Sequence, residues 1–168
     1  RWFFAGKKIR QQSDMIPVLF ITAKSMEEDK LKGFMAGADD YITKPFSMQE
    51  LMLRMEVFLR RTKKLQSDAA EEYHLGKLRF AYNELKIYTD SEALSLTQRE
   101  ADLLKFFALH LNKILKREEL LLNVWGKDDY FLGRSMDVFI TKLRKHLKAD
   151  PAISLETIHG VGFRLQIK

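Results

Sequence analysis

The side chains best suited to chemistry in this sequence are the cations of residues 134–148, RSMDVFITKLRKHLK. If this stretch is a helix, apolar residues at steps of four, three and four form one of its faces. These residues are Met136, Ile140, Leu143 and Leu147. The opposite face then carries Lys, Arg, Ser, Thr and Val side chains. Such a face suits either a solvated surface helix or contact with DNA phosphates and base edges, and the neighbouring elements must decide between the two.

The sequence offers no catalytic or metal-binding grouping. Its four histidines, at positions 74, 110, 146 and 159, are scattered and have no carboxylate or second histidine at ligand spacing. The chain has no cysteine, which excludes disulfides, thiolate chemistry and cysteine-based metal sites. No Ser-His-Asp or Cys-His arrangement can be argued. We therefore expect a binding protein and not an enzyme, with no cofactor held by this chain.

The composition indicates a folded protein with a mild preference for polyanions. With 168 residues, 46% of them hydrophobic, the chain can form one large or two small domains. It carries 29 basic and 23 acidic residues, and the basic excess is larger after residue 72. No apolar run approaches the roughly 20 residues of a membrane span, and nothing reads as a signal peptide, so we expect a cytoplasmic protein. Because the chain begins with Arg1, we expect it to be part of something longer.

The second half of the sequence predicts three helices followed by a β-hairpin. Thr97 and Glu100 form a capping-box pattern, which indicates the start of a helix. The predicted elements are strands near 75–80, 84–89 and 92–96, helices at 97–111, 117–125 and 134–148, a loop at 126–133, and a hairpin of 155–158 and 163–167. Three helices, the last of them basic, followed by a hairpin describe a winged helix-turn-helix. This pattern favours the DNA-contacting interpretation of residues 134–148.

The first half predicts strands alternating with helices. The expected helices are 1–12, 26–37 and 48–61, and the expected strands are 18–22 and 40–43. Strand–helix–strand–helix at this spacing indicates a doubly wound α/β unit. We divide the chain into residues 1–62, a polar linker without periodicity at 63–72, and a second domain at 73–168.

Both halves together resemble one family, the OmpR/PhoB-type response regulators. RSMDVFITKLRKHL and ETIHGVGFRL resemble the recognition helix and the wing of that family, and LTQREADLL and REELLLNVWG resemble its first two DNA-binding-domain helices. PVLFITAK and GADDYITKPF resemble the fourth and fifth strands of its receiver domain. The resemblance implies a flavodoxin-like α/β receiver fragment, with the last two strands and flanking helices, plus an α+β winged helix-turn-helix domain. It also implies a two-component transcriptional regulator that binds double-stranded DNA with sequence specificity.

The resemblance further implies which residues face DNA. They are Arg134, Ser135, Val138, Thr141, Lys142, Arg144 and Lys145 in the recognition helix, with Thr157, His159 and Arg164 in the wing. The cations can neutralise phosphates, whereas Val138 and Thr141 suit a thymine methyl or a base edge. Phe139 and Thr141 stand where better-studied members often have His and Arg, and His159 stands where an Arg is frequent. The base preference therefore cannot be carried over. We expect Trp125 to pack in the core.

Three residues of the first half match the receiver switch: Thr22, Tyr41 and Lys44. In the family this lysine pairs with an acyl phosphate and the threonine hydrogen-bonds it. The acceptor aspartate and the acidic pair that holds a divalent metal would lie before Arg1, so this chain alone cannot take a phosphoryl group. We expect Pro45 to follow a cis bond in the family manner. The strand 18–22 would have an unpaired apolar edge where a third strand belongs.

A further set of residues matches the family's twofold dimer face, formed by receiver helix 4, strand 5 and helix 5. Its charged members are Lys30, Asp39, Asp40, Glu50, Arg54 and Arg61, and its apolar members are Leu31, Phe34 and Met52. Solvated helix charges would give the same pattern. Six matched charges around an apolar patch favour the dimer face, and we expect a homodimer.

The family also implies a sensor histidine kinase and RNA polymerase as partners, the latter through the loop 126–133. We expect no membrane partner. Three alternatives stay open: a phosphorylation-independent regulator of the same family, a protein–protein interaction module whose basic helix meets an acidic surface, and an enzyme-like phosphorelay component. Salt-dependent duplex binding distinguishes the second from a DNA-binding protein. An acceptor aspartate would be needed for the third.

Overall fold

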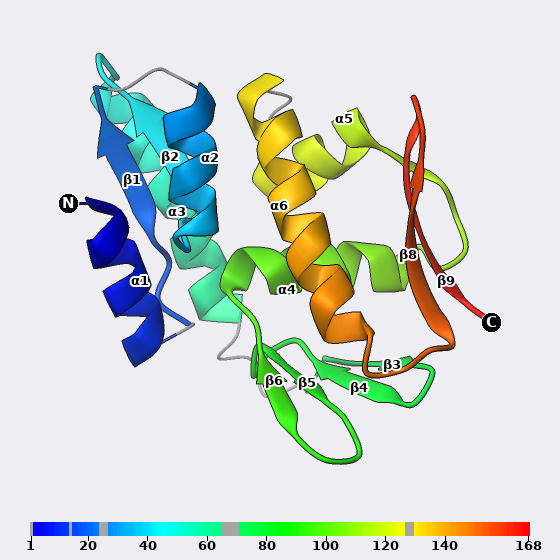
Figure 1. Cartoon of the computed structure of the whole chain (residues 1–168). Helices are drawn as coiled ribbons and strands as arrows, with labels where there is room; N and C mark the ends of the chain where they lie inside the picture. Colours follow the sequence, from blue (N-terminus) through cyan, green and yellow to red (C-terminus); the bar gives the residue numbers. More distant parts are fainter. Residues whose placement is uncertain (1, 14, 24–26, 65–70, 127–129) are drawn as a thin grey trace.

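The structure is a computed structural model of the chain, and it describes residues 2–13, 15–23, 27–64, 71–126 and 130–168. The two halves of the chain form two bodies that lie side by side (Figure 1). The first contains three helices and a small parallel sheet, and the second contains two antiparallel sheets and a group of helices. This is the predicted combination of an α/β receiver fragment and an α+β winged helix-turn-helix domain.

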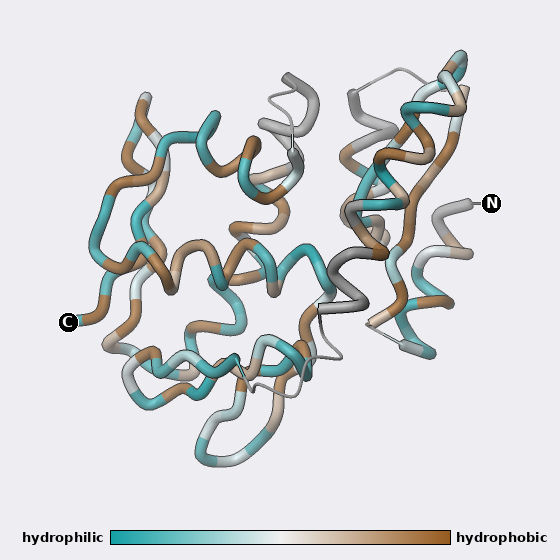
Figure 2. The backbone as a smooth tube through the Cα atoms, turned by 180° about the vertical axis from the view of Figure 1, so that it is seen from behind, coloured by the Kyte–Doolittle hydropathy of each residue, from teal (hydrophilic) through white to brown (hydrophobic). Residues whose placement is uncertain are grey.

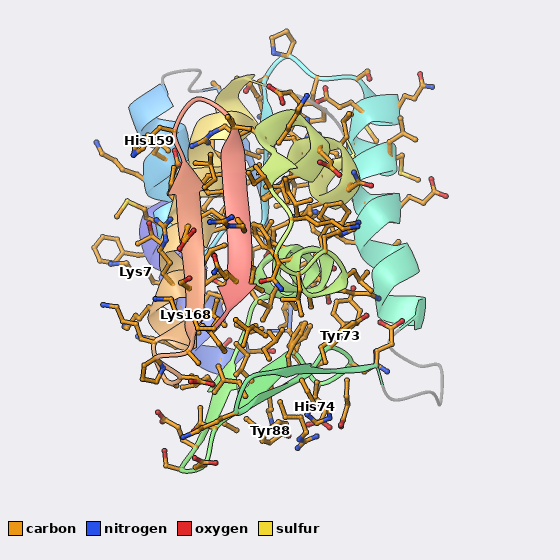
Figure 3. The ribbon with its side chains drawn as sticks, turned by 90° about the vertical axis from the view of Figure 1, so that its right-hand side faces the viewer. Lys7, Tyr73, His74, Tyr88, His159 and Lys168 are labelled. Atoms are coloured by element: carbon orange, nitrogen blue, oxygen red, sulfur yellow. The ribbon has the colours of Figure 1, made fainter. Side chains whose placement is uncertain are left out.

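The first half has the predicted alternation of strands and helices. Its elements are α1 (Trp2–Gln12), β1 (Leu19–Thr22), α2 (Glu27–Met35), β2 (Asp40–Thr43) and α3 (Met48–Lys64). The strands β1 and β2 run parallel, with Leu19 opposite Asp40 and Thr22 opposite Thr43. Helices α1 and α2 lie on one side of these strands and α3 on the other (Figures 1 and 3). Helix α3 extends to Lys64 and so enters the predicted linker, whose residues 65–70 lie outside the described part of the chain.

The small sheet of the first half has an open apolar side. Within the described residues β1 pairs with β2 alone, and Ile21 of β1 is exposed. Helix α3 presents an exposed apolar stripe at steps of four, three and four, formed by Met48, Met52, Met55 and Leu59. The open edge of β1 and this stripe of α3 are therefore exposed apolar surface in this structure.

The second half begins with a four-stranded antiparallel sheet where three strands were predicted. Its strands are β3 (Glu72–Leu75), β4 (Leu78–Ala81), β5 (Lys86–Tyr88) and β6 (Ala93–Ser95). The predicted strand 75–80 is wrong because Gly76 adopts a φ of +56° and turns the chain between β3 and β4. The capping box at the start of α4 (Gln98–Leu109) is confirmed. The Thr97 hydroxyl accepts a hydrogen bond from the Glu100 N–H, and the Glu100 carboxylate accepts one from the Thr97 N–H at 2.9 Å.

The remaining elements form the helix-turn-helix and the wing. They are β7 (Leu115–Lys116), α5 (Arg117–Leu120), a π-helical turn η1 (Leu121–Trp125), α6 (Tyr130–Leu147), β8 (Ile153–Ile158) and β9 (Gly162–Ile167). Strand β9 pairs with both β7 and β8. Helix α6 already begins at Tyr130, so the predicted loop 126–133 is shorter than expected, and its residues 127–129 lie outside the described part of the chain.

One apolar core joins these elements. Phe80, Phe107, Phe139 and Phe163 are fully buried in it, and Trp125 is buried as predicted. The alternation of brown and teal along the helices and the hairpin in Figure 2 reflects one face toward this core and one toward solvent. Truncating one such phenylalanine to alanine typically costs about 3–5 kcal/mol. The core therefore fixes the orientation of α6.

The two halves meet through α2 and the helices of the second half. Helix α2 lies beside α6 (Figure 1), and the rings of Phe34 and Phe139 meet edge-on with centroids 5.8 Å apart. Arg99 of α4 is 1% exposed and reaches the first half, where its Nε donates to the Asp39 carbonyl at 3.4 Å. Its guanidinium lies 5.1 Å from the centre of the Phe58 ring. The contact between the halves thus includes an aromatic pair and the buried cation of Arg99.

Candidate nucleic-acid interface

Helix α6 has the predicted division into an apolar and a basic face. Its predicted apolar residues Met136, Ile140, Leu143 and Leu147 are all at most 2% exposed. Helix α4 and the strand β8 pack against α6 in the second half. On the outer face Thr141 and Lys145 are exposed and Val138 is partly buried, whereas the side chains of Arg134 and Ser135 lie outside the described part of the structure.

Thr141 and Lys142 make contacts within the protein itself. The Thr141 hydroxyl donates to the Asp137 carbonyl at 2.8 Å, which leaves its oxygen and methyl facing outward. The Nζ of Lys142 lies 3.4 Å from Glu100 Oε1, and this carboxylate also accepts the capping hydrogen bond from Thr97. Lys142 is half-buried, and its Nζ lies 5.5 Å from the centre of the Phe139 ring. Part of the charge of Lys142 is therefore balanced by Glu100 in the unbound protein.

Arg144 lies between the recognition helix and the wing. Its Nε donates to the Leu155 carbonyl at 2.7 Å, and its Nη2 donates to the Thr157 hydroxyl at 2.8 Å. Arg144 and Thr157 were both predicted to face DNA. The structure pairs them with each other, so Arg144 braces β8 against α6 and sets the angle between helix and hairpin.

The wing is the hairpin of β8 and β9. Gly160 turns the chain at its tip with a φ of +73°, and the Val161 N–H donates to the Ile158 carbonyl at 3.0 Å. His159 is exposed at this tip (Figure 3). Arg164 donates to Glu156 at 2.8 Å across the two strands, and this hydrogen bond lowers the pKa of the Glu156 carboxyl. Much of the charge of Arg164 is therefore already balanced within the hairpin.

The receiver residues gather at the carboxyl ends of the two parallel strands. Thr22 ends β1, and its carbonyl accepts a hydrogen bond from the Lys44 N–H at 2.7 Å. The Lys44 side chain is exposed, and the Lys44–Pro45 bond is cis as predicted. Tyr41 is 6% exposed and lies near Phe34, with ring centroids 6.4 Å apart. The structure thus places Thr22 and Lys44 together at one edge and Tyr41 inside.

The residues predicted to form a dimer face are largely engaged within the chain. Arg10 pairs with Asp39, and Arg54 pairs with both Asp40 and Glu50, at 2.8 and 2.7 Å. Burial raises the pKa of the Asp39 carboxyl, against the lowering effect of Arg10 and of the hydrogen bond from the Val18 N–H. The carboxylates of Asp39 and Asp40 are therefore buried and not solvated, whereas Glu50 stays partly exposed.

The apolar residues of the predicted dimer face differ in how far they are exposed. Phe34 is 1% exposed and packs against Phe139 of the second half, so it is covered in this arrangement, and its place in a dimer face stays a prediction. Leu31 is partly buried and Met52 is exposed. The side chains of Lys30 and Arg61 lie outside the described part of the structure.

Neither a metal site nor a membrane-spanning helix is found among the described residues. No three His, Asp or Glu side chains of this part of the chain come together as metal ligands. None of its helices combines the length and the apolar character needed to cross a bilayer.

Comparison with known proteins agrees with this arrangement. Residues 4–56 match the family described as "Response regulator receiver domain", and residues 91–165 match "Transcriptional regulatory protein, C terminal". The fold and these matches define a receiver segment joined to a winged-helix domain. The chain belongs to the OmpR/PhoB-type response regulators, a family of two-component transcriptional regulators.

Individual relatives span most of the chain. Transcriptional regulatory protein RprY of Bacteroides fragilis is 44% identical over 163 residues, which cover 97% of this chain and 69% of that protein. The structure of a RitR mutant covers 99% of this chain and 74% of its own, with a TM-score of 0.70 at 25% identity. The DNA-binding domain of E. coli CadC covers 60% of this chain and 96% of its own, with a TM-score of 0.52 at 29% identity.

Proposed function

We propose that this chain regulates transcription by binding double-stranded DNA sequence-specifically through α6 and the β8–β9 hairpin. The observation that carries the proposal is the outer face of α6, where Thr141 and Lys145 are exposed while the opposite face is fixed in the core. A helix of this kind fits a major groove about 12 Å wide, and a hairpin beside it can reach the backbone or the next groove. The similarity to the CadC DNA-binding domain supports the same function.

The proposed roles of the individual residues follow from the chemistry of their side chains. Lys145, Lys142 and Arg134 would neutralise phosphates and release counterions, which supplies sequence-independent affinity. Thr141 and Val138, with Ser135, would read base edges or a thymine methyl. His159 would contact DNA from the tip of the wing, whereas Arg144 and Arg164 would position the hairpin through Thr157 and Glu156.

DNA binding in this way requires the two halves to separate. Leu31 and Met35 of α2 line a groove of about 590 Å³ together with Val138, Thr141 and Lys142 of α6. Helix α2 therefore occupies part of the space that a DNA duplex needs in order to place α6 in its major groove. Separation exposes Phe34, which then becomes available to the predicted dimer face.

The proposed function includes a homodimer, with a sensor histidine kinase and RNA polymerase as further partners. In the separated form, Phe34, Leu31 and Met52 would form the apolar centre of a twofold contact, with the Arg54–Asp40 pair beside it. Light scattering of the chain with and without a two-site duplex tests this contact. A monomer on two adjacent half-sites would contradict it.

The experiment that tests DNA binding is selection from random duplexes followed by fluorescence anisotropy on the selected sequence. We expect a motif with a repeat and an affinity that falls steeply with salt. The double substitution Lys142→Ala and Arg134→Ala should abolish most of this binding. Lys113→Ala, in the turn after α4, is the matched control because it removes one exposed lysine away from α6. Absence of any enriched duplex would leave the protein–protein alternative in place.

A further inference from the structure

A basic groove lies at the junction of the two halves, between α1 and α6. Its volume is about 470 Å³, which is within the range of pockets that hold small molecules. Six of its lining residues carry the argument: Lys7, Arg10 and Gln11 on α1, and Lys142, Lys145 and His146 on α6. The groove is separate from the receiver switch at Thr22 and Lys44.

The two helices present the same pattern to the groove. On each helix the lining residues are at positions i, i+3 and i+4, which share one face. On α1 the face begins with Lys7, and on α6 it begins with Lys142. The first turn of α4, with Thr97 and Glu100, lines the groove between them. The arrangement therefore brings cations from both halves of the chain to one cavity.

The carboxylates close to this groove are already paired with cations of the chain. Arg10 pairs with the buried Asp39 and also donates to the Gly37 carbonyl at 2.9 Å. Lys142 pairs with Glu100. Within the described part of the chain, Lys7 and Lys145 have no ion-pair partner. The groove thus keeps an excess of positive charge, and like charges that face each other across it repel.

We propose that this groove binds a small soluble ligand that carries several phosphate groups. A chain of phosphates can contact cations on both helices at once and so offset their repulsion. Lysine ammonium groups act as point charges toward phosphate and impose no fixed geometry, which suits such a ligand.

Such a ligand would oppose DNA binding. It would tie α1 to α6 and so hold the two halves in the arrangement where α2 lies beside α6. It would also compete with DNA phosphates for Lys142 and Lys145. This consequence rests on the proposed function, but binding of the ligand itself does not.

The test is calorimetric titration of the whole chain with inorganic triphosphate at fixed ionic strength and without DNA. We expect saturable binding, with an affinity about tenfold lower for Lys7→Gln, since loss of one charged contact to phosphate is worth about that factor. Lys8→Gln is the matched control, because Lys8 is an exposed neighbour on the same helix and does not line the groove. Lys7→Arg should retain binding. No saturable binding, or equal losses for Lys7→Gln and Lys8→Gln, would overturn the proposal.

A second experiment distinguishes binding of a small ligand from contact with the phosphates of a DNA backbone. Lys7→Gln should leave the affinity for the selected duplex within about twofold in the absence of triphosphate, since α1 lies outside the proposed DNA interface. If duplex affinity instead falls as much as triphosphate affinity, the groove is a DNA backbone contact and the small-ligand proposal is wrong. Because the first experiment contains no DNA, its result stands whether or not the chain binds a duplex.

Discussion

The ring of Phe34 on α2 meets the ring of Phe139 on α6 edge-on, with centroids 5.8 Å apart and an interplanar angle of 68°. Phe139 also meets Trp125 at 5.5 Å, so its ring belongs both to the core of the second half and to the contact between the halves. Phe34 contacts Tyr41 in the first half and Phe139 in the second half. These two phenylalanines therefore couple the position of α2 to the exposure of α6.

Phe34→Ala should loosen this contact without unfolding the second half. The pair is worth about 0.5–1.5 kcal/mol beyond its buried area, so the population with separated halves should rise by up to about tenfold. Duplex affinity, measured by fluorescence anisotropy, should rise with it. Phe4→Ala is the control, because Phe4 is 80% exposed on α1. An unchanged or weaker duplex affinity for Phe34→Ala would show that α2 does not restrict α6.

Arg99→Lys should destabilise the chain by about 2 kcal/mol. The guanidinium donates to the carbonyls of Asp39 and Val124 and lies over the rings of Phe58 and Trp125. A lysine ammonium has no planar group to stack and cannot satisfy both carbonyls from the same position. Urea unfolding at neutral pH measures the difference. Lys105→Arg on the same helix is the control, and equal effects would mean that planarity at position 99 does not matter.

Local patterns predicted much of this fold, whereas contacts between distant segments could not be predicted. The capping box joins Thr97 to Glu100, and the apolar face of α6 repeats within one helix, so both follow from neighbouring residues. Arg10 and Asp39 are 29 residues apart, and Arg99 and Asp39 are 60 apart. Nothing in the sequence distinguishes these arginines from solvated helix cations, because their partners are set by the packing of the two halves.

The same long-range packing gives candidate-site residues contacts that the sequence did not predict. The family resemblance assigned Arg144 to DNA and Phe34 to a dimer face, but the wing accepts hydrogen bonds from the first and Phe139 covers the second. The groove that contains Lys7 was not predicted at all. Its only sequence signal is the spacing of Lys7, Arg10 and Gln11, which is common on surface helices.

Asp150→Asn should lower stability at neutral pH and flatten the acid dependence of unfolding. The Asp150 carboxylate accepts hydrogen bonds from the N–H groups of Lys77 at 2.7 Å and Ala152 at 2.9 Å, and these lower its pKa. A carboxyl whose folded pKa is depressed stabilises the fold above its unfolded pKa of 3.8, and this stabilisation is lost as pH falls through the folded pKa.

The measurement is the free energy of unfolding in urea between pH 7 and pH 2.5. The wild type should lose more stability than Asp150→Asn below about pH 4. Asp90→Asn makes the same change of charge at an exposed turn and is the control. Parallel curves for the wild type and Asp150→Asn would contradict the assignment.

Two glycines of the wing should respond differently to alanine. Gly160 has a φ of +73° and open space around it, so Gly160→Ala should cost about 1–2 kcal/mol from backbone strain alone. At Gly162 a Cβ would lie 1.9 Å from the Leu115 carbonyl oxygen, so Gly162→Ala must push β7 away from β9 and should cost about 3 kcal/mol or more. Thermal unfolding ranks the two variants, and a smaller loss for Gly162→Ala would contradict the close approach of β7.

Lys145→Ala and Lys142→Ala should differ in their effect on the salt dependence of duplex binding. Each phosphate contact contributes about 0.9 to the slope of log affinity against log salt. Lys145 is exposed without an ion-pair partner in the described part of the chain, so its removal should reduce the slope by nearly this amount. Lys142 is paired with Glu100 in the unbound protein, and the loss of this pair offsets part of the energy of a phosphate contact. Lys142→Ala should therefore weaken duplex binding less than Lys145→Ala. In a Glu100→Gln background the two lysine substitutions should reduce the slope by similar amounts, because Lys142 then has no carboxylate partner at position 100. Equal slopes for both lysine variants in the wild-type background would mean that the Lys142–Glu100 pair does not persist in the unbound protein.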